Sequence, residues 1–193
     1  MIRSKPLLIL ASLGVALAPL GANADCLKAS SGEAGFDGPG TFTTPEGFEI
    51  TIAPADYTPH GDNALGFVKA GIAASECLGA HEAYGLKSAA LRLSFSATAP
   101  VRVVSISYCA AYPVINISAG SEIPPAYREN WKRNPIPGEI TDNAGNRVAV
   151  VNAPVWNGDI YLDEAQLTLS GAADLQTVLF GLREGFITEI CVN

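Results

Sequence analysis

The C-terminal stretch LQTVLFGLREGFITEICVN, Leu175–Asn193, decides the fold that the sequence predicts. It predicts one strand over 175–180 and a second over 186–192, joined by a turn over 181–185 that has glycine at both ends. Alternation in the second strand predicts one face with Phe186, Thr188, Ile190 and Val192, and an opposite face with Ile187, Glu189 and Cys191. A terminal strand with a cysteine needs an earlier partner strand and an earlier cysteine. The candidate partners are the segment after Cys26 and the strand expected over 48–52.

The first 24 residues have the features of a secretory signal peptide. Arg3 and Lys5 precede an apolar run over 7–20, and Ala22-Asn23-Ala24 fits a cleavage site. An uncleaved membrane anchor is the alternative. Cleavage leaves one domain, 25–193, and takes the formal net charge from −7 to −9, because both charges that are lost are basic. We therefore expect a secreted or periplasmic protein.

The charge and hydropathy of the mature chain narrow its partners. Its acidic charge disfavours nucleic acid and anionic membranes. No later apolar run reaches the roughly 18 residues of a membrane span, so we expect no membrane insertion of the mature chain.

Four cysteines, Cys26, Cys77, Cys109 and Cys191, lie in the predicted mature chain. An even number in an exported protein indicates two disulfides, for which three pairings are open. We favour Cys26–Cys191 and Cys77–Cys109, because the first pair would join the two terminal strands. The absence of a C-x-x-C motif argues against a zinc site.

The rest of the chain consists of short alternating segments separated by turn signals. Strands are expected at 48–52, 64–69, 91–96, 101–108, 114–119, 147–152, 160–162 and 166–170. No long segment has a helical period. This pattern predicts an all-β fold, a two-sheet antiparallel β-sandwich of jelly-roll type with two disulfides.

Two stretches are similar to secreted bacterial jelly-roll modules of the galactose-binding-like, carbohydrate-binding type. LRLSFSATAPVRVVSISY, 91–108, resembles their central hairpin, and GFITEICV, 185–192, resembles their closing strand. The resemblance covers roughly the C-terminal hundred residues. It implies a jelly roll that binds carbohydrate.

The same resemblance implies a structural calcium ion as the one cofactor to consider. Its ligands would be Glu189 of the closing strand with Glu33 or Asp37 near the N-terminus. Three carboxylates do not fill the six to eight positions of calcium. The preferred interpretation of Glu189 is therefore a solvated carboxylate on a strand, with no cofactor.

Catalytic motifs are largely absent. His60 and His81 are in no metal-binding motif, there is no G-x-S-x-G elbow, and the cysteines are expected to be oxidised. The sequence therefore disfavours an enzyme, although a pair of carboxylates could still serve a glycosidase.

The segment PPAYRENWKRNPIP, 124–137, is the best binding candidate in the sequence. It combines aromatic rings with cations, a combination that suits sugar rings or acidic partners. The candidate residues are Tyr127, Arg128, Trp131, Lys132 and Arg133, with Trp156 as an extension. The alternative is that Trp131 packs beneath its own loop and the basic side chains are solvated.

These observations predict an exported binding module for carbohydrate or another cell-envelope or extracellular component. The alternatives are a protein-interaction or structural envelope protein that uses the 124–137 loop, and a small extracellular hydrolase or lyase. The expected partner is accordingly a glycan or an extracytoplasmic protein.

Overall fold

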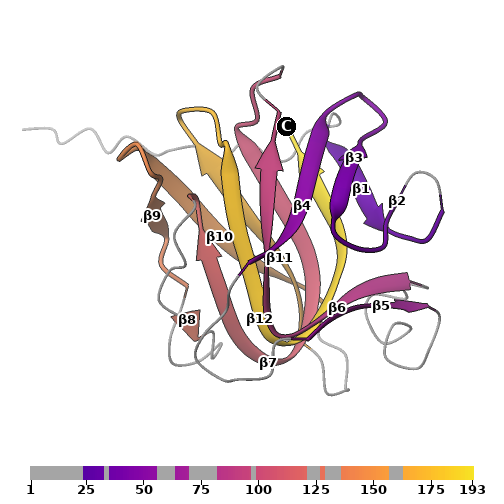
Figure 1. Ribbon diagram of the computed structural model, residues 1–193. Coiled ribbons are helices and arrows are strands. Elements are labelled where there is room, and N and C mark those ends of the chain that lie inside the picture. Colours follow the sequence, from indigo (N-terminus) through magenta and orange to yellow (C-terminus); the bar gives the residue numbers. More distant parts are fainter. Residues whose placement is uncertain are drawn as a thin grey trace, which may run out of the picture.

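The computed structural model describes residues 24–32, 35–55, 64–69, 82–96, 99–120, 127–128, 136–156 and 163–193. These residues form strands and turns without any helix (Figure 1). The strands are β1 (Asp25–Ala29), β2 (Gly35–Phe36), β3 (Gly40–Thr43), β4 (Glu49–Ala55), β5 (Ala64–Lys69), β6 (Glu82–Phe95), β7 (Val103–Ser118), β8 (Tyr127–Arg128), β9 (Glu139–Thr141), β10 (Arg147–Trp156), β11 (Asp163–Gly171) and β12 (Thr177–Val192). Among the described residues, no helix is long and apolar enough to cross a membrane.

The described strands form one hydrogen-bonded sheet in the order β3-β4-β6-β12-β7-β11-β10-β9. The other four strands attach at the sides: β1 to β12, β2 to β1, β5 to β6 and β8 to β7. All pairs are antiparallel except β1 with β2. The all-β, mainly antiparallel prediction is confirmed. The described residues do not divide into the two separate sheets expected, and the jelly-roll order stays a prediction.

Strand β12 is the centre of this sheet. One of its sides pairs with β6 over 177–187 and with β1 over 189–192, and the other side pairs with β7 from Leu179 to Val192. The prediction of a hairpin turn over 181–185 is therefore wrong, because the strand continues through these residues. Neither Gly181 nor Gly185 has a positive φ. The pairing partners on both sides keep this segment extended.

The three long strands bend at one level, which we call the corner. In β12 the register shifts around Glu184, at the level where Leu182 lies opposite both Ala89 of β6 and Ile115 of β7. At the same level β6 contains Ser88, with φ at 46°, and β7 contains Pro113. Proline has no N–H to give to a ladder and so fits a bulge better than a regular strand. The bends therefore line up across the sheet.

The corner folds the sheet into two facing layers. Figure 1 shows β12 running down, turning at the bottom of the view and rising again to the C-terminus. Layer one holds β3, β4, β8, the second halves of β6 and β7 and the first half of β12. Layer two holds the other halves with β1, β2, β5, β9, β10 and β11. The ring of Tyr108 in layer two packs at a tilt against the ring of Phe180 in layer one, with centroids 5.4 Å apart, so the core lies between the layers.

The two glycines of β12 permit the close approach of its neighbours. A Cβ at Gly185 would overlap the Cys109 carbonyl oxygen and lie 2.9 Å from the Ala110 Cα. A Cβ at Gly181 would lie 2.8 Å from the Ala90 Cβ. Both distances are below ordinary contact, so these glycines are required by packing and not by a left-handed backbone.

The core faces of the strands agree in part with the predicted alternation. Val104, Ile106 and Tyr108 are all buried on one face of β7, as the sequence predicts. In β12 a register shift between Ile187 and Glu189 places Ile187 and Ile190 together in the core. The prediction that they lie on opposite faces is wrong, because a bulge adds one residue and reverses the alternation.

Strand β1 is the partner that the terminal strand requires. Cys26 lies opposite Cys191 in the β1–β12 ladder, and the two form a disulfide. The prediction of this bridge is confirmed. Cys77 lies outside the described residues, so the Cys77–Cys109 bridge stays a prediction.

Two other predicted pairings are wrong. The strand predicted at 48–52 overlaps β4, which pairs with β6 and β3 and not with β12. The segments at 91–96 and 101–108 were expected as a hairpin or as a pair of strands at a sheet corner; the hairpin is excluded, because β12 lies between β6 and β7. In both cases the competing strand comes from the far end of the chain.

We predict that Gly185→Ala lowers the free energy of unfolding by about 1–3 kcal/mol, because the methyl group meets rigid backbone atoms of β7. The matched control is Gly38→Ala, where a Cβ meets nothing within 4 Å. It should change stability by less than about 1 kcal/mol. Urea unfolding measures both, and equal stabilities of the two variants would contradict the packing role of Gly185.

We predict that the double variant Cys26→Ser/Cys191→Ser loses about 2–4 kcal/mol of stability, because the bridge closes a long loop in the unfolded chain. Thermal unfolding of the oxidised wild type, the reduced wild type and the double variant measures the effect. Reduction breaks every bridge in the chain, so the double variant is the sample that isolates Cys26–Cys191. An unchanged melting temperature in the double variant would show that the β1–β12 ladder holds without the disulfide.

Candidate functional site

A polar pocket of about 340 Å³ lies where three connections meet at one end of the sheet. It lies among the end of β7, the β9–β10 turn and the β11–β12 connection. The pocket is at the small end of the roughly 300–1,000 Å³ usual for small-molecule sites. Its lining consists of Ala119, Gly120, Asp142, Asn143, Ala144, Asn146, Ala173, Asp174, Leu175, Gln176 and Thr177.

The Asp142 carboxylate holds the β9–β10 turn in shape. Its Oδ1 accepts hydrogen bonds from the backbone N–H groups of Ala144 and Asn146, at 2.9 and 2.7 Å. Its Oδ2 accepts one from Asn146 Nδ2 at 2.9 Å. Gly145 has a φ of 84°, a value that glycine adopts without strain. One carboxylate thus orders this wall of the pocket.

The turn packs against the end of β7. A Cβ on Gly120 would overlap the carboxamide of Asn143, so the Asn143 side chain lies directly against the end of β7.

The β11–β12 connection forms the opposite wall. Leu175 is buried, and its N–H donates to the carbonyl of Val101 at 2.6 Å. Asp174 pairs with Arg102, Oδ1 to Nε at 3.3 Å, but both side chains are more than half exposed. Such an exposed pair contributes at most about 1 kcal/mol. The buried leucine, more than the ion pair, anchors this wall.

The pocket lining offers hydrogen-bonding groups together with two carboxylates, those of Asp142 and Asp174. The hydrogen bond from the Asn146 side chain, together with backbone N–H donors, lowers the pKa of Asp142 below its ordinary value. Asp142 therefore stays ionised at neutral pH and is a poor proton donor there. Carboxamides from Asn143, Asn146 and Gln176 supply both donors and acceptors.

The residues that the sequence favours for binding lie elsewhere. The backbone of β8 places Tyr127 opposite Ile115 and Arg128 opposite Val114. The end of β10 places Trp156 opposite Glu164 of β11. Strands β8 and β11 flank the same side of β7, one on each side of the corner. The structure therefore brings these backbone positions to one side of β7, while Trp131, Lys132 and Arg133 lie outside the described residues.

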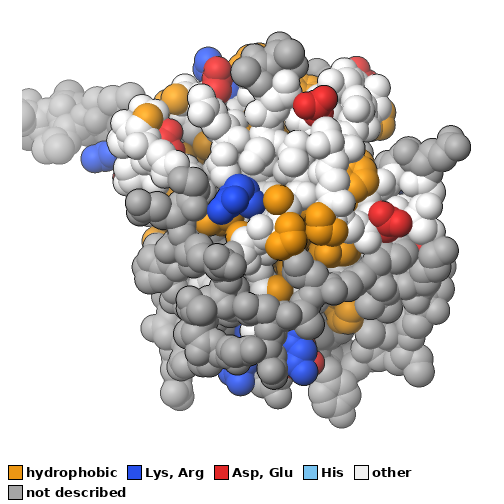
Figure 2. Space-filling model, in the orientation of Figure 1, with side chains coloured by type: hydrophobic (Ala, Val, Ile, Leu, Met, Phe, Trp, Pro, Cys, Tyr) orange, Lys and Arg blue, Asp and Glu red, His pale blue; other side chains and the backbone are white. Residues whose placement is uncertain are grey.

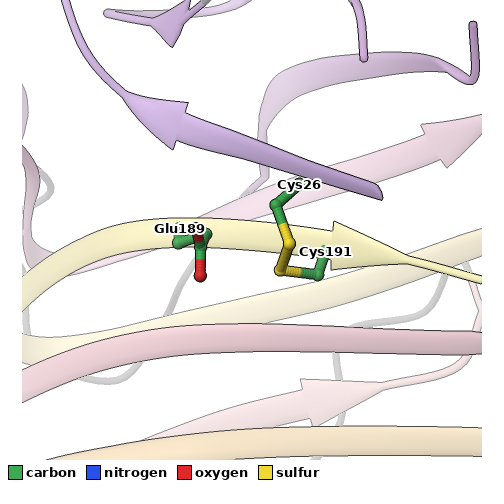
Figure 3. A group of neighbouring side chains, drawn as sticks. All are labelled: Cys26, Glu189 and Cys191. Atoms are coloured by element: carbon green, nitrogen blue, oxygen red, sulfur yellow. A yellow bond between two sulfur atoms is a disulfide. The ribbon is translucent and has the colours of Figure 1, made fainter. Parts of the chain in front are cut away.

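The predicted calcium ligands are not gathered within the described residues. Glu189 lies beside the Cys26–Cys191 disulfide (Figure 3), and the three form the one potential ligand group of described residues. Both sulfurs of that group are in the bridge, so it offers a single carboxylate. Asp37 is not in this group. The pKa of the Tyr84 phenol is raised above its ordinary value, mainly by burial and next by the charge of Asp37. Glu33 lies outside the described residues.

Comparison with protein-family models, with curated proteins and with solved structures gives no match for this chain. The case for a site therefore stands on the geometry of the chain itself.

The segment 141–146 is not among the candidate sites that the sequence predicts. The sequence does contain a feature that indicates a site here, because three polar planar side chains follow one another closely at a strand end: Asp142, Asn143 and Asn146. Their convergence with Gln176 and Thr177 depends on which strands are neighbours, and that information is not local.

We predict that Asp142→Ala lowers stability at neutral pH and that the loss disappears in acid. The lowered pKa means that the ionised form stabilises the folded turn above the ordinary aspartate pKa of about 3.9. The contribution is lost as the pH falls through the lowered folded value. Melting temperatures of wild type and variant from pH 7 to pH 2.5 should therefore converge. A gap that is independent of pH would contradict a role for the charge.

Proposed function

We propose that this protein is an exported, secreted or periplasmic, binding module for carbohydrate, and that the pocket between the β9–β10 turn and the β11–β12 connection binds the sugar. The observation that carries the proposal is the lining of this pocket. Planar carboxamides and carboxylates alternate with small apolar groups of Ala119, Ala144 and Ala173. Sugar hydroxyls need such paired donors and acceptors, and the C–H faces of sugars fit small apolar contacts.

The rest of the architecture supports a binding role. The pocket is formed by loops on a rigid β scaffold, where binding residues are usually found. The disulfide supports an oxidising compartment outside the cytoplasm.

The proposal includes two finer features of the fold, a jelly-roll strand order and a Cys77–Cys109 disulfide. Cys109 is fully buried, and no described cysteine is free, which supports the second bridge. Calcium is not part of the proposed site, because the described ligand group around Glu189 has only one carboxylate.

We predict that Gln176→Ala and Thr177→Val each weaken glycan binding about five- to tenfold, because each removes about one hydrogen bond to a hydroxyl. A glycan array identifies the sugar, and calorimetry on the best glycan measures the affinities. Gln166→Ala is the matched control, because Gln166 is half-buried on β11 of layer two, away from the pocket lining.

A parallel Trp131→Ala variant separates this pocket from the sequence-predicted loop at 124–137. Loss of binding in Trp131→Ala with full binding in the two pocket variants would move the site to that loop. Binding of no glycan at all would refute the carbohydrate proposal and return the protein-interaction and hydrolase or lyase alternatives to first place.

A further inference from the structure

The Cys26–Cys191 disulfide has a carboxylate beside it. The carboxylate of Glu189 and the two sulfur atoms all lie within 4.8 Å of one another. Figure 3 shows Glu189 on the same strand as Cys191, with its side chain next to the bridge that crosses from β1. Glu189 precedes Cys191 by two residues, so alternation along β12 places both on one face of the sheet. A glutamate is ionised at neutral pH, so the bridge has a negative charge in its immediate surroundings. The wider surface in Figure 2 carries scattered acidic and basic side chains, and this carboxylate is the one that lies at the bridge.

The two ends of the bridge differ in their access to solvent. Cys191 is 5% exposed and is paired on both sides, with Cys26 of β1 and with Ser105 of β7. Cys26 is half-buried, and β1 pairs with β12 along one side. Within the part of the chain that the structure describes, the other side of β1 pairs with β2 only at Lys28 and Ala29. A reagent in solvent therefore reaches the bridge from the Cys26 end.

The carboxylate opposes the chemistry that opens a disulfide. Thiol–disulfide exchange begins when a thiolate attacks one sulfur of the bridge and expels the other sulfur as a thiolate. Attack at Cys26 forms a mixed disulfide on Cys26 and releases Cys191 as the leaving thiolate. At least one negative charge is spread over the sulfurs throughout this step. Glu189 repels that charge, and the buried position of Cys191 adds the cost of holding the leaving thiolate away from water.

Lys28 places one positive charge on the same face. It lies opposite Glu189 in the β1–β12 ladder and two residues from Cys26, a step of about 7 Å along the strand. Lys28 is exposed, whereas Glu189 is half-buried. Water and salt screen an exposed charge more than a half-buried one, so the carboxylate dominates the field at the bridge.

We propose that the Cys26–Cys191 bridge is a thiol-exchange site at which Glu189 selects the reacting thiol by its charge. Cys26 is the sulfur that is attacked, and Cys191 is the sulfur that leaves. Anionic thiols react slowly, and neutral or cationic thiols react faster. The selection protects the bridge between β1 and β12 from acidic thiols, and the partner that fits this site is a neutral or cationic thiol.

The full reaction consumes two thiols for each bridge that is opened. The first thiolate forms the mixed disulfide on Cys26 and releases the Cys191 thiolate. A second thiolate attacks the sulfur of the first reagent in the mixed disulfide, which releases the Cys26 thiolate and carries the reagent away as its own disulfide. Both cysteine thiolates then take protons from water. The bridge gains two electrons and the two reagent thiols lose them, so the exchange is balanced.

Rates of mixed-disulfide formation with three thiols of similar size test the proposal. Cysteamine carries a cation, 2-mercaptoethanol is neutral and 3-mercaptopropionate carries an anion. Each rate is divided by the wild-type rate with the same thiol, so that the intrinsic reactivity of the thiols cancels. In low salt, Glu189→Gln should react about three- to fivefold faster with 2-mercaptoethanol, the effect of one unit charge about 5 Å away in water. The ratio should be larger for 3-mercaptopropionate and smaller for cysteamine, and salt should reduce it.

Glu184→Gln is the matched control, because it removes the same charge from an exposed position at the corner of β12. Lys28→Gln should slow the reaction, and Glu189→Asp should keep the wild-type order of the three thiols. An equal ratio for all three thiols, or a Glu184→Gln effect as large as that of Glu189→Gln, would overturn the role of Glu189.

Peptide mapping of acid-quenched samples locates the first mixed disulfide and separates this bridge from the other cysteines. A first mixed disulfide on Cys26 supports the assignment of the attacked sulfur, and one on Cys191 would overturn it. Circular dichroism of each variant checks that it is folded before the rates are compared.

Discussion

The close approach of β7 and β6 to β12 at its two glycines is the constraint on which the rest of this structure depends. A side chain at Gly185 would overlap the backbone of β7, and one at Gly181 would press on Ala90. Because these positions lack a side chain, one strand pairs on both sides through a bend. Both layers share that strand, so the core between Tyr108 and Phe180 closes without a separate second sheet in the described residues.

The corner also determines where function can lie. Folding β7 and β12 at the corner sends the end of β7 and the start of β12 to the same end of layer one, where Leu179 pairs with Ser118. The β9–β10 turn, which is held by hydrogen bonds to the Asp142 carboxylate, packs against Gly120 at that end. The pocket is thus a consequence of strand order.

The sequence predicted the local features of this fold well and its long-range features poorly. Alternation identified the buried face of β7, and the terminal position of Cys26 and Cys191 identified their bridge. Gly181 and Gly185 were misinterpreted as turn residues, because glycine serves close packing as well as turns. The pocket was missed because Asp142 and Gln176 belong to separate loops that only the strand order brings together. The predicted loop around Trp131 stays a prediction.

The most direct test of the central claim, that β12 is one continuous strand, is nuclear Overhauser spectroscopy of the labelled protein. A continuous strand predicts backbone contacts from Leu182 to both Ala89 and Ile115, and from Phe186 to Gly85. A hairpin over 181–185 would instead give contacts between Phe180 and Phe186 and none from Leu182 to Ala89. Observation of that hairpin pattern would contradict the folded sheet and the pocket that depends on it.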